Sequence, residues 1–214
     1  ELIRPAEEDL FRAGGFDLIE SRRSIRTFDG RAVPREAIER AVAAAATAPA
    51  PHGSRSARPW KVVWLRTETT RGRFLDAMES AWRRDLADDR TPSGKIDRLI
   101  GRSRSLLGGA PVLLAFFVSL AGADAYRDAA RVLAEREMFL AAAGASVQNL
   151  MLALTAQGVA SCWLSTSIFC SEEAGRALGL DAGWQAVGCV VAGYPSSEPP
   201  PRGVVDPSPF LDIR

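Results

Sequence analysis

The chain has 214 residues, a length that favours one compact domain over two. Apolar residues make up 47% of the chain and charged residues 25%, proportions that exclude a disordered protein. The 27 basic and 26 acidic side chains leave a net charge of +1, which excludes a strongly cationic nucleic-acid-binding protein and an acidic tail protein.

In chain order, the first half of the sequence alternates helical spacing with turn-rich loops. Apolar side chains that recur every three or four residues predict amphipathic helices, and a proline favours the start of one of them. The expected helices cover Phe16–Arg22, the segment after Pro34 that carries Ile38, Val42, Ala45 and Ala46, Phe74–Leu86, and Ile96–Leu107. A strand is expected at Trp60–Leu65, and loops are expected at Pro49–Arg58 and Asp88–Gly94.

The second half begins with a buried strand and the longest helix. Val112–Val118 is a continuous apolar run with β-branched and aromatic residues, typical of a strand buried on both faces. Asp128–Gln157 is the longest helical pattern, and its part Met138–Ala156 is apolar on nearly every side. Such a helix is expected in the middle of the fold, packed against other elements or across a dimer axis. Gly158 is expected to end it as a left-handed cap.

Two more strands and a short helix complete the pattern. The strands are expected at Val159–Leu164 and Trp184–Ala192, and Ser171 is expected to cap a short helix between them. Residues 195–214 form a Pro-rich, extended tail that needs another surface to lie on. Because strands and helices mix without regular βαβ alternation, the predicted class is α+β, with a single domain over residues 1–214.

Several familiar motifs are absent from the sequence. It has no GxGxxG after a strand, no GxxxxGKS/T and no GxSxG, which argues against a Rossmann NAD site, a P-loop and a serine hydrolase. His52 is the only histidine and the three cysteines lack CxxC spacing, so neither a metal site nor a disulfide framework is expected. The longest apolar run, Ala110–Ala123, is too short to span a membrane, and a soluble cytoplasmic protein with free thiols is expected.

The strongest local signal is the sequence Arg-Arg-Ser-Ile-Arg-Thr-Phe at positions 22–28. Arg22, Arg23 and Arg26 bring three guanidinium groups together, with hydroxyl groups and no acidic residue among them. Phosphate is recognised by forked guanidinium donors and by hydroxyls at short range. The segment therefore predicts an anion-binding site, with a solvated basic surface as the alternative.

An ordered set of short motifs extends over nearly the whole chain, from Phe16 to Arg202. After residues 22–28 come Arg-Pro-Trp at 58–60, Gly144 with Gln-Asn-Leu at 148–150, Gly158, Ser-Cys-Trp-Leu at 161–164, Leu-Gly-Leu at 178–180 and Gly-Tyr-Pro at 193–195. In this order the motifs resemble those of the nitroreductase-like flavoproteins. The resemblance implies a mixed β-sheet flanked by helices, a long central buried helix, and an intertwined homodimer that holds FMN at the subunit interface.

The resemblance also implies roles for individual residues. Arg22, Arg23 and Ser24 would hold the phosphate and ribityl chain of FMN, Arg26 would lie near the N1 edge of the ring, and Arg202 would close over the phosphate. Ser54 and Ser56 would contact FMN from the second subunit, and Ser165 would lie against the ring. No catalytic side chain is implied, because the flavin carries the chemistry and the protein positions it.

Two segments, Arg55–Leu65 and Trp163–Ser171, resemble one branch of the family more closely. This branch is the C-terminal domain of the actinobacterial coenzyme F420:L-glutamate ligases. The likeness implies reduction of dehydro-F420-0 to F420-0, an anionic substrate, and an N-terminal ligase domain in a longer protein, with which a start at Glu1 agrees. Arg55 and Arg58 are expected to bind that substrate. A general FMN nitroreductase and a non-redox module that binds F420 or FMN are the alternatives.

Overall fold

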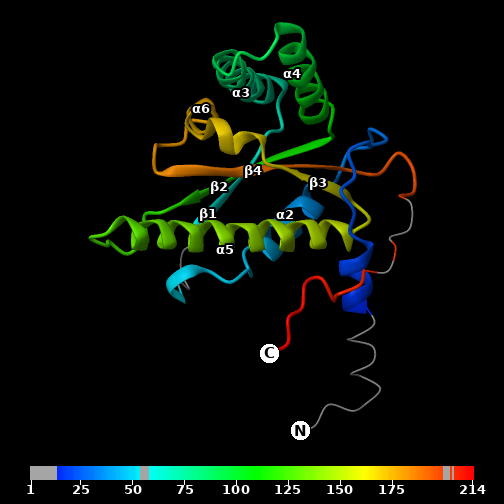
Figure 1. Cartoon of the computed structure of the whole chain (residues 1–214). Helices are drawn as coiled ribbons and strands as arrows, with labels where there is room; N and C mark the ends of the chain where they lie inside the picture. Colours follow the sequence, from blue (N-terminus) through cyan, green and yellow to red (C-terminus); the bar gives the residue numbers. More distant parts are fainter. Residues whose placement is uncertain (1–13, 54–57, 200–202, 204) are drawn as a thin grey trace.

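The computed structural model describes residues 14–53, 58–199, 203 and 205–214, and its centre is a four-stranded sheet (Figure 1). The strands are β1 (Trp60–Trp64), β2 (Val112–Ser119), β3 (Ala160–Leu164) and β4 (Trp184–Gly193). They lie side by side in the order β1-β2-β4-β3, so β1 and β3 form the two edges. All four strands expected from the sequence are present within two residues of their predicted ends.

The sheet corrects one expectation, because its strands pair antiparallel throughout instead of forming a mixed sheet. Within the part of the chain that is described, the parallel pairing is confined to an isolated bridge between Ser24 and Ser161. A second isolated bridge, between Phe28 and Pro195, is antiparallel. The N-terminal segment therefore runs beside the outer edge of β3 without becoming a strand of the sheet.

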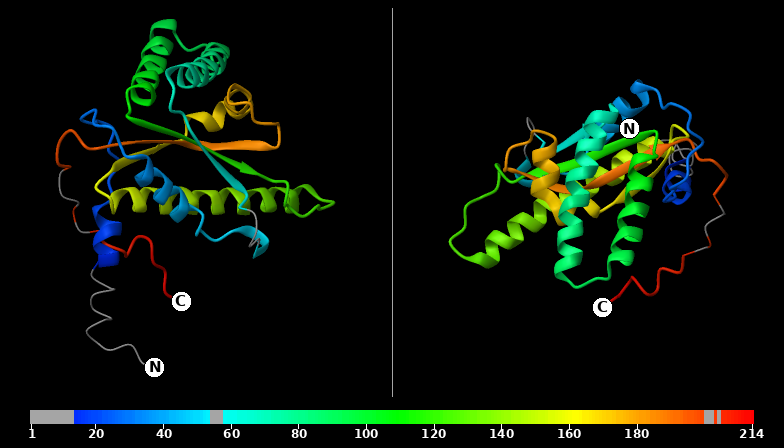
Figure 2. Two further views of the ribbon diagram at one scale, coloured as in Figure 1. Left: turned by 180° about the vertical axis from the view of Figure 1, so that it is seen from behind. Right: turned by 90° about the horizontal axis from the view of Figure 1, so that it is seen from above.

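Helices cover both faces of the sheet, which confirms the α+β class (Figures 1 and 2). One face carries α2 (Arg35–Ala45) and α5 (Ala129–Thr155), and the other carries α3 (Glu68–Asp88), α4 (Ser93–Gly108) and α6 (Ser171–Ala177). Residues 14–21 are also helical, and two short 3-10 helices, η1 (Pro51–Gly53) and η2 (Thr166–Cys170), lie between the larger elements.

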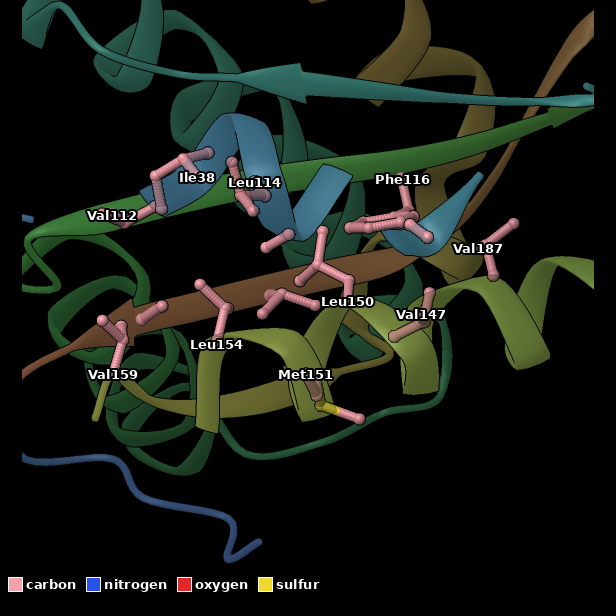
Figure 3. Packing of buried hydrophobic residues seen from close by; sticks show 14 of the residues in the cluster. Ile38, Val112, Leu114, Phe116, Val147, Leu150, Met151, Leu154, Val159 and Val187 are labelled. Carbon is pink, nitrogen blue, oxygen red and sulfur yellow. The ribbon is translucent and has the colours of Figure 1, made fainter. Parts of the chain in front are cut away.

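Strand β2 divides the core between the two faces, as its apolar sequence predicts. Leu114 and Phe116 pack against Leu150 and Ile38 on the side of α5 and α2 (Figure 3). The intervening Leu113, Ala115 and Phe117 belong to the cluster on the side of α3 and α6. Because successive side chains of a strand point to opposite faces, a strand between two helical layers must be apolar at every position.

Helix α5 is less enclosed than its composition suggests. Its buried side chains form one stripe that includes Phe139, Val147 and Leu154, whereas Val132 and Leu133 are each 50% exposed. By length and composition α5 is the one helix, among the described residues, that could cross a membrane, yet it packs along the sheet as a core helix does. The central position expected for Met138–Ala156 is confirmed, and the exposed Val132 and Leu133 precede that part of the helix.

Two local expectations need correction. The loop expected at Asp88–Gly94 is shorter, because α3 extends to Asp88 and α4 begins at Ser93, leaving residues 89–92, in which Arg90 has a positive φ of 57°. Ser171 does not cap α6 with its side chain; its Oγ instead accepts a hydrogen bond from the N–H of Ala186 at 2.7 Å. The expected left-handed Gly158 (φ 71°) and the three buried free cysteines are confirmed.

Candidate functional site

The arginine-rich segment lies against the first residues of β3. The N–H of Ile25 donates to the carbonyl oxygen of Ser161 at 3.0 Å, and the chain then continues to the Phe28–Pro195 bridge at the end of β4. Helix 14–21 ends immediately before the segment, so the cluster at 22–26 follows a helix end and is fixed by an edge strand. The backbone hydrogen bond to β3 thus helps to set the position of the cluster.

The arginines of this segment lie near the thiol of Cys162 on β3. Burial raises the pKa of the Cys162 thiol, while the charges of Arg26 and Arg22 and a hydrogen bond with Ser24 act to lower it. Arg23 lines a small pocket of about 140 Å³. The other residues around this pocket come from the end of helix 14–21, the arginine segment, the end of α5 and the residues after it, and the segment after β4: Ser21, Ile25, Thr155, Gly158, Val159, Ala160, Pro195 and Pro199.

From this cluster, the outer edge of β3 leads to Ser165. Backbone groups of alternate strand residues point the same way, so those of Trp163 point outward like the Ser161 carbonyl that Ile25 reaches. Four residues of strand span about 13 Å. We call residues 22–26 together with 161–166 the β3 edge site; basic groups lie at one end of it and Ser165 and Thr166 at the other.

Two hydroxyl groups in the β3 edge site are buried without a hydrogen-bond partner among the described residues. They are Ser161 Oγ and Thr166 Oγ1. A buried hydroxyl without a partner is costly, and a polar ligand that reached either group would satisfy it. Sequence reasoning gave them no role, although Ser161 and Thr166 are polar residues beside the apolar core of β3, which is the signal that could have found them.

A larger cavity adjoins the Ser165 end of the site. Its volume is about 470 Å³, and it lies between α3, α4 and η2. Most of its wall is apolar, and Ser165 and Thr166 belong both to the cavity and to the β3 edge site. The remaining lining residues are Leu75, Met78, Glu79, Trp82, Asp85, Leu86, Asp89, Ile100, Ser103, Arg104, Leu107, Phe169 and Cys170. The apolar stripe of α3 therefore contributes to a cavity wall as well as to the core.

The other predicted site residues are not all brought to this place. Ser54, Arg55, Ser56 and Arg202 lie outside the described residues. Arg58 is exposed and directly precedes β1, which lies at the opposite edge of the sheet from β3. Within one chain, Arg58 is thus separated from the arginine cluster by the width of the sheet.

The only histidine forms a cluster that the sequence did not predict. His52 Nε2 lies 2.5 Å from Glu135 Oε1, which also accepts the N–H of Asp124 at 2.9 Å. The hydrogen bond with Glu135 raises the pKa of His52, and the same bond lowers the pKa of Glu135, whose side chain is only 7% exposed. The ion pair connects η1 with α5.

This pair predicts a pH-dependent stability. The contribution of His52 is fully present below its ordinary pKa of 6.5 and is lost as the pH rises through its raised folded-state pKa. The contribution of Glu135 is present above 4.5 and is lost as the pH falls through its lowered pKa. We expect the melting temperature of His52→Gln to lie furthest below that of the wild type near about pH 5.5, and the difference to shrink by about pH 9. A difference that does not vary with pH would contradict the ion pair.

Comparison with known proteins places this geometry in a family. Residues 19–194 match the nitroreductase family, and the chain belongs to that family. It is 26% identical over 183 residues to YfhC of Bacillus subtilis (strain 168), which carries the name of an NAD(P)H nitroreductase, covering 86% of this chain and 85% of that protein.

Solved structures share the fold at low sequence identity. A BluB-like flavoprotein from Clostridium difficile 630 aligns with a TM-score of 0.74 at 20% identity, over 93% of this chain and 98% of that one. A nitroreductase with bound FMN from Desulfitobacterium hafniense DCB-2 aligns with a TM-score of 0.68 at 18% identity, over 93% and 97% of the two chains. The predicted nitroreductase-like fold is confirmed.

Proposed function

We propose that this chain binds FMN along the β3 edge site and acts as an FMN-dependent oxidoreductase. The observation that carries the proposal is the arrangement of this edge, with arginines at one end and an apolar cavity at the other. Between them are two buried hydroxyls for which the described part of the chain offers no hydrogen-bond partner. FMN has the same order of parts, a phosphate, a hydroxylated chain and a flat ring. Its binding in a family member of the same fold supports the assignment.

Different residues of the β3 edge site would bind different parts of FMN. Arg22 and Arg23, with Ser24, hold the phosphate, and Arg26 supplies positive charge near the ring. The hydroxyls of Ser161 and Thr166 bond to polar atoms of the ligand, and the backbone beside Ser165 faces the ring edge. Bound FMN would supply two-electron hydride chemistry between a reduced nicotinamide and the acceptor, and solvent would supply the proton.

A second copy of the chain completes this site in our proposal. Val132, Leu133 and Met138 leave apolar surface exposed on α5, and Phe169 beside the cavity is 79% exposed. Helix 14–21 and the C-terminal tail extend away from the body of the fold, and they expose Phe16 and Phe210 (Figure 1). Apolar surface of this extent favours association of two copies into a homodimer.

We infer that the acceptor occupies the cavity between α3 and α4, and a general nitroreductase activity is the first candidate. In that reaction a nitro group takes a hydride and a proton and loses water to give a nitroso group. The name of the relative YfhC favours this candidate, as does the apolar cavity wall, which suits an aromatic ring. The buried free thiols fit a protein of the reducing cytoplasm.

Reduction of dehydro-F420-0 is the second candidate, in a longer protein with a glutamate ligase domain. The likeness of Arg55–Leu65 and Trp163–Ser171 to the F420:L-glutamate ligase branch favours it. The second of these segments contains Ser165 and Thr166, at the boundary of the β3 edge site and the cavity. The acceptor would take a hydride and a proton across its unsaturated bond. A module that binds F420 or FMN without turnover is distinguished by the same experiment.

The test is anaerobic turnover of FMN-loaded protein with each acceptor. Nitroaromatic reduction by a reduced nicotinamide, without conversion of dehydro-F420-0, is the result expected for the first candidate. Conversion of dehydro-F420-0 that depends on reduced FMN would select the second. If a reduced nicotinamide does not reduce the bound FMN, and neither acceptor reoxidises the reduced flavin, the protein is not an oxidoreductase.

A further inference from the structure

The cavity between α3 and α4 is lined by more acidic than basic side chains. Four charged side chains line it, namely Glu79, Asp85, Asp89 and Arg104. The guanidinium of Arg104 is already bound by Asp76 at 2.7 Å and by Glu79 at 3.1 Å. Glu79 also pairs with Arg83 at 3.3 Å. The single basic group of the lining is therefore neutralised by neighbouring carboxylates.

The remaining two carboxylates form no ion pair with any residue that the structure describes. Asp85 and Asp89 lie one helical turn apart at the C-terminal end of α3, which ends at Asp88. The partial negative charge of a helix C-terminus adds to theirs. The charge of Asp85 is felt at Cys170, which also lines the cavity. Burial raises the pKa of the Cys170 thiol to about 11, and the charges of Glu173 and Asp85 add to this effect.

We propose that this cavity selects acceptors by charge and disfavours a ring that carries an anionic group. The inference rests on the proposed function and narrows its substrate class to neutral or cationic flat rings. Asp85 and Asp89 are exposed beside the apolar wall, so an anion that enters the cavity approaches two like charges that no described cation neutralises. An acceptor with carboxylate or phosphodiester groups would have to leave them outside the cavity.

The test compares three nitrobenzene derivatives that differ in charge: 4-nitrobenzoate, 4-nitrobenzyl alcohol and (4-nitrobenzyl)trimethylammonium. The measured quantity is kcat/KM for FMN-loaded wild type and for the double variant Asp85→Asn/Asp89→Asn. For each protein we take the ratio of kcat/KM for the anionic acceptor to kcat/KM for the neutral acceptor. The intrinsic reactivity of each acceptor is the same with both proteins, so a difference between their ratios reports charge selection by the cavity. We expect this ratio to rise about 3- to 10-fold in the double variant, and the ratio of the cationic to the neutral acceptor to fall.

Asp88→Asn is the control, because it removes one negative charge, half of what the double variant loses, from between the two positions without lining the cavity. It should leave both ratios at the wild-type values, whereas a change half as large as that of the double variant, or larger, would show a general effect of net charge and overturn the proposal. If the double variant turns over all three acceptors with the wild-type ratios, the charge-selection proposal is overturned and the nitroreductase function stands. No turnover of any acceptor by the FMN-loaded wild type would instead overturn the nitroreductase function.

Discussion

Replacing Gly188 by alanine is expected to lower the free energy of unfolding by about 2–5 kcal/mol, from strain of the backbone and from overpacking together. Gly188 lies in β4 at a φ of 140°, a conformation that side chains other than glycine rarely adopt. A Cβ atom there would lie 2.2 Å from Trp163 Nε1 and 2.9 Å from the carbonyl oxygen of Leu164. The tryptophan could rotate, but the carbonyl belongs to the neighbouring strand and can move only if β3 moves.

Thermal unfolding measures the effect, and a chain of this size should lose roughly 5–15 °C in melting temperature. Gly144→Ala in α5 is the control. A Cβ atom added there would lie 3.8 Å from Cη2 of the same tryptophan, which is an ordinary contact distance. Alanine favours a helix by about 1 kcal/mol over glycine, so this variant should be neutral or more stable. Equal melting temperatures for Gly188→Ala and wild type would show that the packing of Trp163 on β4 is wrong.

Replacing Arg23 by alanine is expected to weaken FMN binding about 10- to 100-fold. A hydrogen bond between charged groups contributes about 1.5–3 kcal/mol, and 1.4 kcal/mol corresponds to a factor of ten in affinity. Arg23 lines the small pocket beside β3, at the end of the site where we place the phosphate. Quenching of flavin fluorescence on binding gives the dissociation constants.

Riboflavin, which lacks the phosphate, separates this role from a structural one. Its affinity should be nearly the same for Arg23→Ala and wild type, because the lost contact is to the phosphate. Arg35→Ala is the control variant, since Arg35 is exposed on α2 and pairs with Glu39. It should bind both ligands normally. An equal loss of FMN and riboflavin affinity in Arg23→Ala would mean that Arg23 supports the fold and does not hold phosphate.

Local patterning predicted most of the fold from the sequence. The unbroken apolar run of β2 and the spacing of Phe74 and Met78 in α3 each result from burial against a neighbouring layer, which leaves a periodic trace in the chain. The expected start of α2 at Pro34 is also confirmed, with Pro34 as its N-cap residue. The antiparallel direction of the sheet was missed, because pairing depends on how distant segments cross and not on local periodicity.

The candidate site could be predicted only in part. The Arg22–Arg26 cluster stands out because guanidinium and hydroxyl groups gather over a few positions. The cavity did not stand out, because Trp82 and Phe169 are distant in sequence and meet only when α3 packs beside η2. The pair of His52 and Glu135 joins residues 83 positions apart and likewise has no local signature.

Flavin binding by the purified protein tests the central claim most directly. The protein, as isolated or after incubation with FMN, should be yellow, show the absorbance bands of a bound flavin, and release one FMN per chain when it is denatured. A folded, colourless protein that takes up no added FMN would contradict the assignment of the β3 edge site.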